Sequence, residues 1–187
     1  MTSRFGLNSW RGQPPYMVVL RLSLAITWIY GGWYKAVDPG YLDPQSPHFF
    51  GTDISRYIGQ SPISFLLKFM ASHAVAGAWF VMLSEFAVGI CVLFGIALQF
   101  ASIGGASIAL TLWLSVSAWQ VPYFAHSEIV WLIGWIVFFM MLRWHEKSRG
   151  HYAEKLFPNL TDSRELVRIG FALILSVALA LIGLQLR

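Results

Sequence analysis

Long apolar segments are the feature of this sequence that most constrains its fold. Five segments come close to the length of about 20 apolar residues that a helix needs to cross the hydrocarbon core of a membrane. They are residues 16–34, 73–98, 101–121, 129–142 and 167–186. The alternating pattern of membrane β-strands is absent from them. We therefore expect an all-α integral membrane protein.

The composition agrees with a membrane protein. Hydrophobic residues make up 57% of the 187 residues, charged residues make up 12%, and the mean hydropathy is +0.60. Soluble domains carry about 25% charged residues. Cys91 is the single cysteine, so the chain alone has no intrachain disulfide, no thiolate metal cluster and no dithiol redox centre. We expect no metal site and no covalently bound cofactor.

The apolar segments divide the chain into four parts. We expect an N-terminal segment at 1–15, a helical bundle at 16–144 with a long connection at 36–72, a basic linker at 145–166, and a fifth membrane helix at 167–187. The long connection begins with DPGYLDPQSP, which is typical of turns. It continues with PISFLLKFMASH, whose apolar residues recur at helical spacing, so we expect an interfacial helix or a lid over the bundle there.

The distribution of Lys and Arg predicts the orientation in the membrane. Arg4, Arg11 and Arg21 precede or begin the first apolar segment, and a second basic group lies in and around the linker. Because cytoplasmic loops are enriched in Lys and Arg, we expect the N-terminus and the linker in the cytoplasm of a bacterial or archaeal cell. The long connection and the C-terminus are then outside. Acidic residues interrupt the basic linker, so lipid, and not nucleic acid, is the partner that we expect.

Glu85 stands alone in the second apolar segment, in the run MLSEFAVGICVLFG. A charged group at the bilayer centre costs about 3 kcal/mol or more, so this carboxylate should face the bundle and be paired or protonated. Ala78 and Gly89 lie on the same helical face and allow a second helix to approach closely. Two interpretations stay open: a structural salt bridge that fixes the helix register, or a site for an ion, a proton or a small polar ligand.

Arg21 and Lys35 of the first apolar segment are the candidate partners of Glu85. The two cations share one helical face, and Glu85 falls between them in depth. We expect Arg21 to pair with Glu85, because a guanidinium forms bidentate pairs with carboxylates. Lys35 is expected to extend outward or to pair with Asp38. Glu85, Arg21 and Lys35 are therefore the candidate catalytic residues.

Two stripes of hydroxyl side chains accompany these residues. They are Ser23, Thr27, Tyr30 and Tyr34 in the first segment, and Ser107, Thr111 and Ser115 in the third. The stripes predict either hydrogen bonds between helices or a polar cavity with Glu85 at its floor. Tryptophans also gather toward the outer half of the third and fourth segments, at Trp113, Trp119, Trp131 and Trp135. They predict either an aromatic belt at the membrane interface or a stacking site for a quinone.

Two runs of residues resemble a known family of membrane proteins. The run RLSLAITWIYGGWYKAVDP is similar to the first helix of the DoxX superfamily, with matches at Arg21, Gly32, Lys35, Asp38 and Pro39. The run SEFAVGICVLFGIALQFASIGGASIALTLWL is similar to its second and third helices, with matches at Glu85, Gly89 and Gly95. The resemblance covers residues 16–144, and the long connection with the stretch 119–122 resembles the DoxD branch.

The resemblance implies a fold and a function. DoxX-like proteins are four-helix membrane bundles, so the fifth helix is an addition here. DoxD is the small membrane subunit of thiosulfate:quinone oxidoreductase, which implies electron transfer from thiosulfate or a similar sulfur anion to quinone. It also implies a partner subunit or a larger membrane complex. The alternative, since DoxX-like proteins serve several roles, is a non-catalytic accessory or assembly subunit.

Overall fold

The computed structural model describes residues 10, 12–122, 124, 126–148 and 163–186, and these residues form helices joined by turns, without a strand. The helices are α1 (Pro15–Val37), α2 (Phe50–Tyr57), α3 (Ser64–Ser72), α4 (Ala74–Phe94), α5 (Leu98–Leu112), the π-helix η2 (Trp113–Ser117), α6 (Ser127–Ser148) and α7 (Ser163–Gln185). The all-α prediction is confirmed. The short helix α2 was not predicted. Much of the basic linker, residues 149–162, lies outside the described residues.

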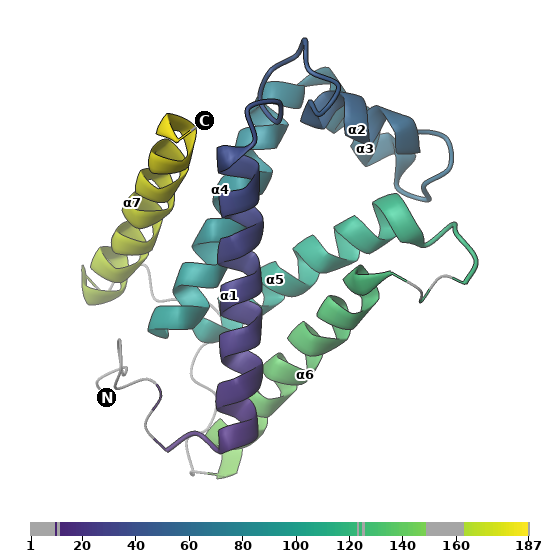
Figure 1. Cartoon of the computed structure of the whole chain (residues 1–187). Coiled ribbons are helices and arrows are strands. Elements are labelled where there is room, and N and C mark those ends of the chain that lie inside the picture. The colour runs from purple at the N-terminus through teal and green to yellow at the C-terminus, as the bar shows by residue number, and fades with distance from the viewer. Residues whose placement is uncertain (1–9, 11, 123, 125, 149–162, 187) are drawn as a thin grey trace.

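Four helical segments are long and apolar enough to cross a membrane. They are Ala74–Phe94, Leu98–Ser117, Ser127–Trp144 and Ser163–Gln185. Helix α1 is as long as α7, at 23 residues, but its aromatic residues and Arg21 lower its hydropathy and it is not among the four. Its crossing therefore stays a prediction, which its packing supports because α1 lies antiparallel along α4 (Figure 1).

Glycines let α1 and α4 approach each other closely. A Cβ atom on Gly89 would lie 2.7 Å from Cγ1 of Ile29, 2.9 Å from the backbone nitrogen of Ile29 and 3.0 Å from the carbonyl oxygen of Ala25. A Cβ atom on Gly32 would lie 2.9 Å from the ring of Phe86. Close backbone contact through small residues is a common way for membrane helices to associate. The predicted packing of the Glu85 face of α4 against a second helix is therefore confirmed.

Replacing Gly89 with alanine is expected to lower the free energy of unfolding by about 1–3 kcal/mol, because the new methyl group would meet backbone atoms that cannot move aside. Gly170, in the middle of α7, is the matched control, since a Cβ atom there meets nothing within 4 Å. Gly170→Ala should be neutral or stabilise by up to about 1 kcal/mol through helix propensity. Denaturant unfolding of both variants in detergent measures this difference, and equal effects would contradict the close α1–α4 contact.

A tight turn joins α4 to α5. Gly95 closes α4 in the left-handed conformation with φ of 74°, and Ala97 follows with φ of 44°. The backbone N–H of Ile96 donates to the carbonyl oxygen of Cys91 at 2.8 Å, which satisfies one of the free carbonyl groups at the helix end. The turn makes α4 and α5 antiparallel neighbours.

Helices α5 and α6 form a hairpin. This hairpin diverges from the pair of helices α1 and α4 toward one end of the molecule (Figure 1). The hydroxyl group of Ser117 in η2 donates to a carboxylate oxygen of Glu128 in α6 at 3.1 Å. On the other side of the bundle, α7 packs on α1 and α4 through small side chains. These are Ala172, Ser176, Ala180 and Gly183, and a Cβ atom on Gly183 would lie 2.5 Å from Cβ of Ala36.

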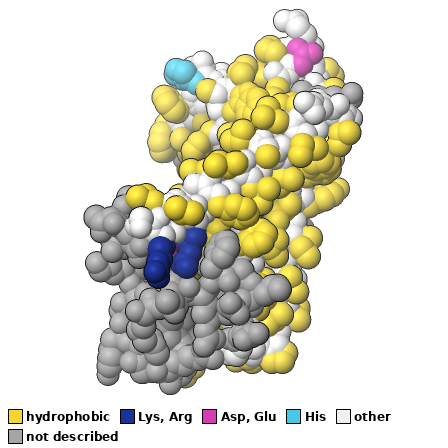
Figure 2. Space-filling model, turned by 90° about the vertical axis from the view of Figure 1, so that its left-hand side faces the viewer, with side chains coloured by type: hydrophobic (Ala, Val, Ile, Leu, Met, Phe, Trp, Pro, Cys, Tyr) yellow, Lys and Arg dark blue, Asp and Glu magenta, His cyan; other side chains and the backbone are white. Residues whose placement is uncertain are grey.

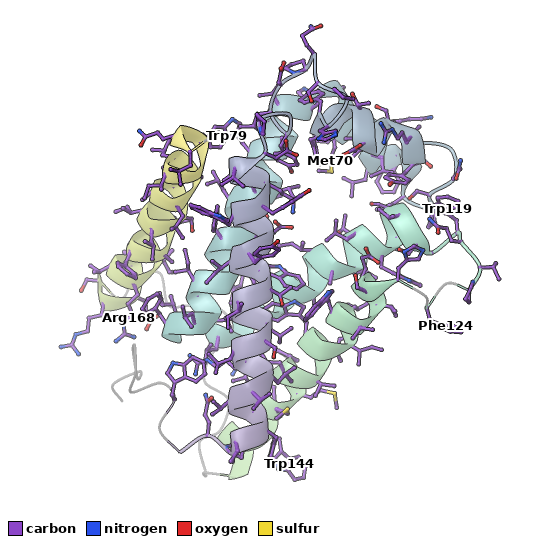
Figure 3. All side chains as sticks on the ribbon, viewed as in Figure 1. Met70, Trp79, Trp119, Phe124, Trp144 and Arg168 are labelled. Atoms are coloured by element: carbon purple, nitrogen blue, oxygen red, sulfur yellow. The ribbon has the colours of Figure 1, made fainter. Side chains whose placement is uncertain are left out.

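Helices α2 and α3 lie across the end of the molecule where the α5–α6 hairpin diverges from α1 and α4 (Figure 1). We call these two helices the cap. The cap contacts α4 on one side and η2 on the other. The hydroxyl group of Ser61, between α2 and α3, donates to the carbonyl oxygen of Leu114 at 2.9 Å. Met70 and Trp119 lie at this end in Figure 3, whereas Trp144 and Arg168 lie at the opposite end. The expectation of a helix at PISFLLKFMASH is confirmed by α3.

The surface around the helices is largely apolar. On the face drawn in Figure 2, hydrophobic side chains cover much of the described part, Lys and Arg lie next to the undescribed residues, and acidic and His side chains lie at the opposite end. Large apolar side chains on the outside of α6 and α7 are more than half exposed, among them Val130, Ile133, Met140, Val167 and Ile174. An exposed apolar surface of this extent fits an integral membrane protein.

Candidate functional site

Glu85 forms an ion pair with Lys35 between α4 and α1. The ammonium nitrogen Nζ of Lys35 lies 2.7 Å from Oε2 and 2.9 Å from Oε1 of Glu85, so one cation binds both carboxylate oxygens. The same nitrogen lies 3.4 Å from the carbonyl oxygen of Gly31, one turn earlier in α1. Charge-assisted hydrogen bonds of this length are strong, and they fix the two helices relative to each other.

The sequence of α1 makes room for this pair. A Cβ atom on Gly31 would lie only 3.1 Å from Oε2 of Glu85, so the glycine leaves space for the carboxylate against the helix backbone. Lys35 is four residues further on, and side chains at this spacing share one helical face. Its long side chain runs back along that face toward Glu85. Gly31 and Lys35 thus form one binding site for the Glu85 carboxylate.

The pair is largely withdrawn from solvent. The side chain of Glu85 is 6% exposed and that of Lys35 is 22% exposed. The neighbouring residues of α4, Met82 and Phe86, are fully buried. In such apolar surroundings a lone carboxylate is costly, and a cation in direct contact offsets that cost. The interpretation that Glu85 is paired and faces the bundle is confirmed.

The predicted pair between Arg21 and Glu85 is wrong. Arg21 is fully buried near the opposite end of α1, where Nε donates to the carbonyl oxygen of Val92 at 2.8 Å and a terminal nitrogen lies 3.4 Å from that of Leu93. Its guanidinium carbon also lies 3.9 Å from the centre of the Trp10 ring. The last carbonyl groups of a helix have no partner within the helix and carry partial negative charge, so a buried cation caps α4 here.

The prediction that Lys35 pairs with Asp38 or extends outward is also wrong. Asp38 begins a turn instead: Oδ1 accepts a hydrogen bond from the backbone N–H of Gly40 at 2.8 Å. Its other oxygen lies 3.9 Å from Nδ1 of His48. Lys35 turns inward because the carboxylate of Glu85, which is 6% exposed, is a stronger partner than that of Asp38, which is 19% exposed.

Tyr41 is a further polar residue beside the pair, and sequence reasoning missed it. It lies in the turns between α1 and α2, is 8% exposed, and packs in one core cluster with Ala36, Ala78 and Met82. Burial, and then the negative charges of Glu85 and Asp53, raise the pKa of the Tyr41 phenol far above its usual value. The phenol therefore stays protonated, and its O–H group is available as a hydrogen-bond donor.

The predicted quinone-binding tryptophans occupy several environments. Trp131 and Trp135 of α6 both meet Trp28 of α1 edge to face, with ring centres 6.2 and 5.0 Å apart. Trp135 is fully buried, which argues against direct contact between its side chain and a bound quinone ring. Trp119 is 38% exposed, and its indole N–H donates to the carbonyl oxygen of Ser115. Trp113 begins η2. Quinone binding by these side chains stays a prediction.

Two side chains of the hydroxyl stripe in the third segment bind backbone oxygens one turn earlier in the chain. Thr111 donates to the carbonyl oxygen of Ser107 at 2.8 Å, and Ser115 donates to that of Thr111 at 2.7 Å. Tyr30 and Tyr34 are 64% and 60% exposed. The expectation that these stripes join neighbouring helices is therefore wrong for Thr111 and Ser115, because the preceding turn of α5 offers a nearer acceptor.

These observations define an all-helical membrane bundle with one buried Lys–Glu pair beneath a two-helix cap. The sequence matches the family described as "TQO small subunit DoxD" over residues 16–145. The chain belongs to this DoxD family. The match includes Arg21, Lys35, Tyr41 and Glu85, and it ends before α7. No curated protein and no solved structure matches the chain.

Proposed function

We propose that this chain is the membrane subunit of a quinone-linked oxidoreductase that passes electrons from thiosulfate, or a similar small sulfur anion, to quinone. The buried Lys35–Glu85 pair carries the proposal, together with membership of the DoxD family. Reduction of a quinone to a quinol takes up two electrons and two protons, so a membrane subunit needs a group that transfers protons inside the bundle. Glu85 is the buried carboxylate beside a cation, and such groups are common proton carriers.

Each residue of the predicted catalytic set then has a separate role. Glu85 takes up and releases a proton, and Lys35 stabilises its charged form. Arg21 is assigned a structural role, because its guanidinium is bound to the end of α4. The single cysteine of this chain cannot form a dithiol centre, so a partner subunit or the quinone itself would carry the electrons.

The test uses the chain with its natural partners. Purification from native membranes in mild detergent, through an affinity tag, should recover a complex that reduces a soluble quinone analogue when thiosulfate is added. The same preparation without thiosulfate is the control. An intact complex that reduces no quinone with thiosulfate or related sulfur anions would contradict the proposed function.

A second candidate is a non-catalytic accessory subunit, which the outer face of α6 favours. Only 17% of the apolar window of α6 is buried within the chain, against 39% for α4. This face could pack on another subunit as well as on lipid. An active complex that keeps its full quinone reduction rate after removal of this chain would support the accessory role.

A further inference from the structure

The hydroxyl group of Tyr41 is a buried donor without a partner among the residues that the structure describes. Tyr41 is 8% exposed, and no described residue accepts a hydrogen bond from its hydroxyl group. Leaving such a donor unpaired reduces stability, and native proteins usually satisfy it through a neighbour, a water molecule or a ligand. The phenol of Tyr41, unpaired among the described residues, therefore indicates that an acceptor atom from outside the chain binds there.

Core packing joins Tyr41 to residues that neighbour Lys35 and Glu85 in the chain. It shares a core cluster with Ala36, which follows Lys35 in α1, and with Met82, one turn before Glu85 in α4. Its ring meets the ring of Phe50 in the cap, with centres 5.7 Å apart. The Tyr41 side chain thus packs against the cap and belongs to the same core cluster as Ala36 and Met82.

The charged residues around Tyr41 favour an uncharged ligand. Lys35 and Glu85 neutralise each other, and Asp53 of the cap lies 3.2 Å from Arg56. Lys35 already contacts both oxygens of Glu85 and the carbonyl oxygen of Gly31. An anion would have to separate Lys35 from Glu85 before it gained a cation, whereas an uncharged oxygen acceptor needs only the free phenol O–H.

We propose that Tyr41 is the hydrogen-bond donor of a buried site for an uncharged oxygen acceptor, with the Lys35–Glu85 pair as its adjoining wall. The acceptor is either a water molecule or the carbonyl oxygen of a quinone head group. An acceptor that comes from a quinone rests on the proposed function, whereas an acceptor that comes from a water molecule does not. In both cases Tyr41 positions the acceptor close to the carboxylate of Glu85.

The variant Tyr41→Phe tests the site, because it removes the hydroxyl group and keeps the ring that packs on Phe50. Tyr16→Phe is the control, since Tyr16 is 68% exposed and lies near the other end of α1. The purified full chain is freed of quinone in nanodiscs, and its thermal unfolding is followed while a short-chain ubiquinone analogue is added. Neither thiosulfate nor a partner subunit is needed.

Two results would support the proposal, and each identifies a source. If the analogue stabilises the wild type and Tyr16→Phe, and Tyr41→Phe needs about tenfold more analogue for the same shift, the acceptor is a quinone carbonyl. If Tyr41→Phe unfolds at a lower temperature without the analogue, and the analogue does not distinguish it from the wild type, the acceptor is water. Tyr41→Phe with an equal or higher unfolding temperature and unchanged analogue binding would overturn the proposal.

A measurement on the wild type alone covers the case in which Tyr41→Phe does not fold. The carbonyl stretching frequency of an isotope-labelled analogue should fall on binding if a phenol donates to that carbonyl. An unshifted carbonyl band in bound analogue would overturn the quinone source. Tyr41-dependent binding without any thiosulfate oxidation by the native complex would overturn the proposed function and leave this site standing.

Discussion

Lys35→Met is expected to lower the free energy of unfolding by about 3 kcal/mol. Removing one partner of a buried ion pair leaves an uncompensated charge, which typically costs about 3–5 kcal/mol, and the lower end applies because the Lys35 side chain is 22% exposed. Glu85 would then be left 6% exposed in apolar surroundings, or would have to bind a proton. Denaturant unfolding of the full chain in detergent micelles measures the change.

The double variant Lys35→Met/Glu85→Gln separates the charge effect from loss of packing. It removes both charges and should recover most of the lost stability, because neutral side chains of similar size can replace a buried pair. Lys68→Met, at an exposed position on α3, is the control and should change little. A loss below about 1 kcal/mol for Lys35→Met would mean that the pair behaves like an exposed one.

Arg21→Met is expected to cost about 2–3 kcal/mol, because it removes the charged hydrogen bonds that Arg21 donates to the carbonyl oxygens of Val92 and Leu93 at the end of α4. The carbonyl oxygen of Leu93 keeps a second donor, the indole N–H of Trp10 at 3.1 Å. The carbonyl oxygen of Val92 would lose its 2.8 Å donor, and the Trp10 ring would lose the guanidinium stacked on it. The C-terminal turn of α4 should then exchange its amide hydrogens faster. Hydrogen exchange and denaturant unfolding measure the two effects.

Arg56→Ala is the matched control for Arg21→Met. Arg56 forms an ion pair with Asp53 at 3.2 Å, but its side chain is 61% exposed. Surface pairs of this kind contribute less than about 1 kcal/mol. Equal losses for the two arginine variants would show that Arg21 does not cap α4. A selective loss for Arg21→Met would establish its structural role and remove it from the set of candidate catalytic residues.

Apolar segment lengths and small residues predicted much of this fold. The apolar segments correspond to α1, α4, α5 with η2, α6 and α7, because a helix that crosses lipid must satisfy its own backbone and present apolar side chains. Gly89 correctly indicated which face of α4 packs against another helix. A short link between the second and third apolar segments also followed from the sequence, but the turn lies at 95–97 and not at 99–100.

The partner of Glu85 could not be predicted, because a sequence gives the depth of each helix only approximately. Arg21 and Lys35 share a face of α1, and a shift of α1 along α4 decides which of them meets Glu85. Close contacts such as Gly32 against Phe86 set that shift, and they become visible only in the packed structure. Lys35 can also bend inward, which the usual outward extension of lysine does not suggest.

Tyr41 and α2 were missed for a different reason. Tyr41 lies among turns, where no helical period relates one residue to the next, and its burial depends on the cap folding over it. Helix α2 is only eight residues long, and it lies directly after the proline-rich turns. Short segments of this kind take their structure from tertiary contacts more than from their own sequence.

The quinone reduction rate of Glu85→Gln in the native complex tests the central claim most directly. The substitution keeps the size of the side chain and its contact with Lys35, but it removes the group that would carry the proton. Loss of a proton-transfer group slows reactions by about a hundredfold or more. We predict an assembled complex whose thiosulfate-dependent quinone reduction is slower by that factor. An assembled Glu85→Gln complex that works at the wild-type rate would contradict the account.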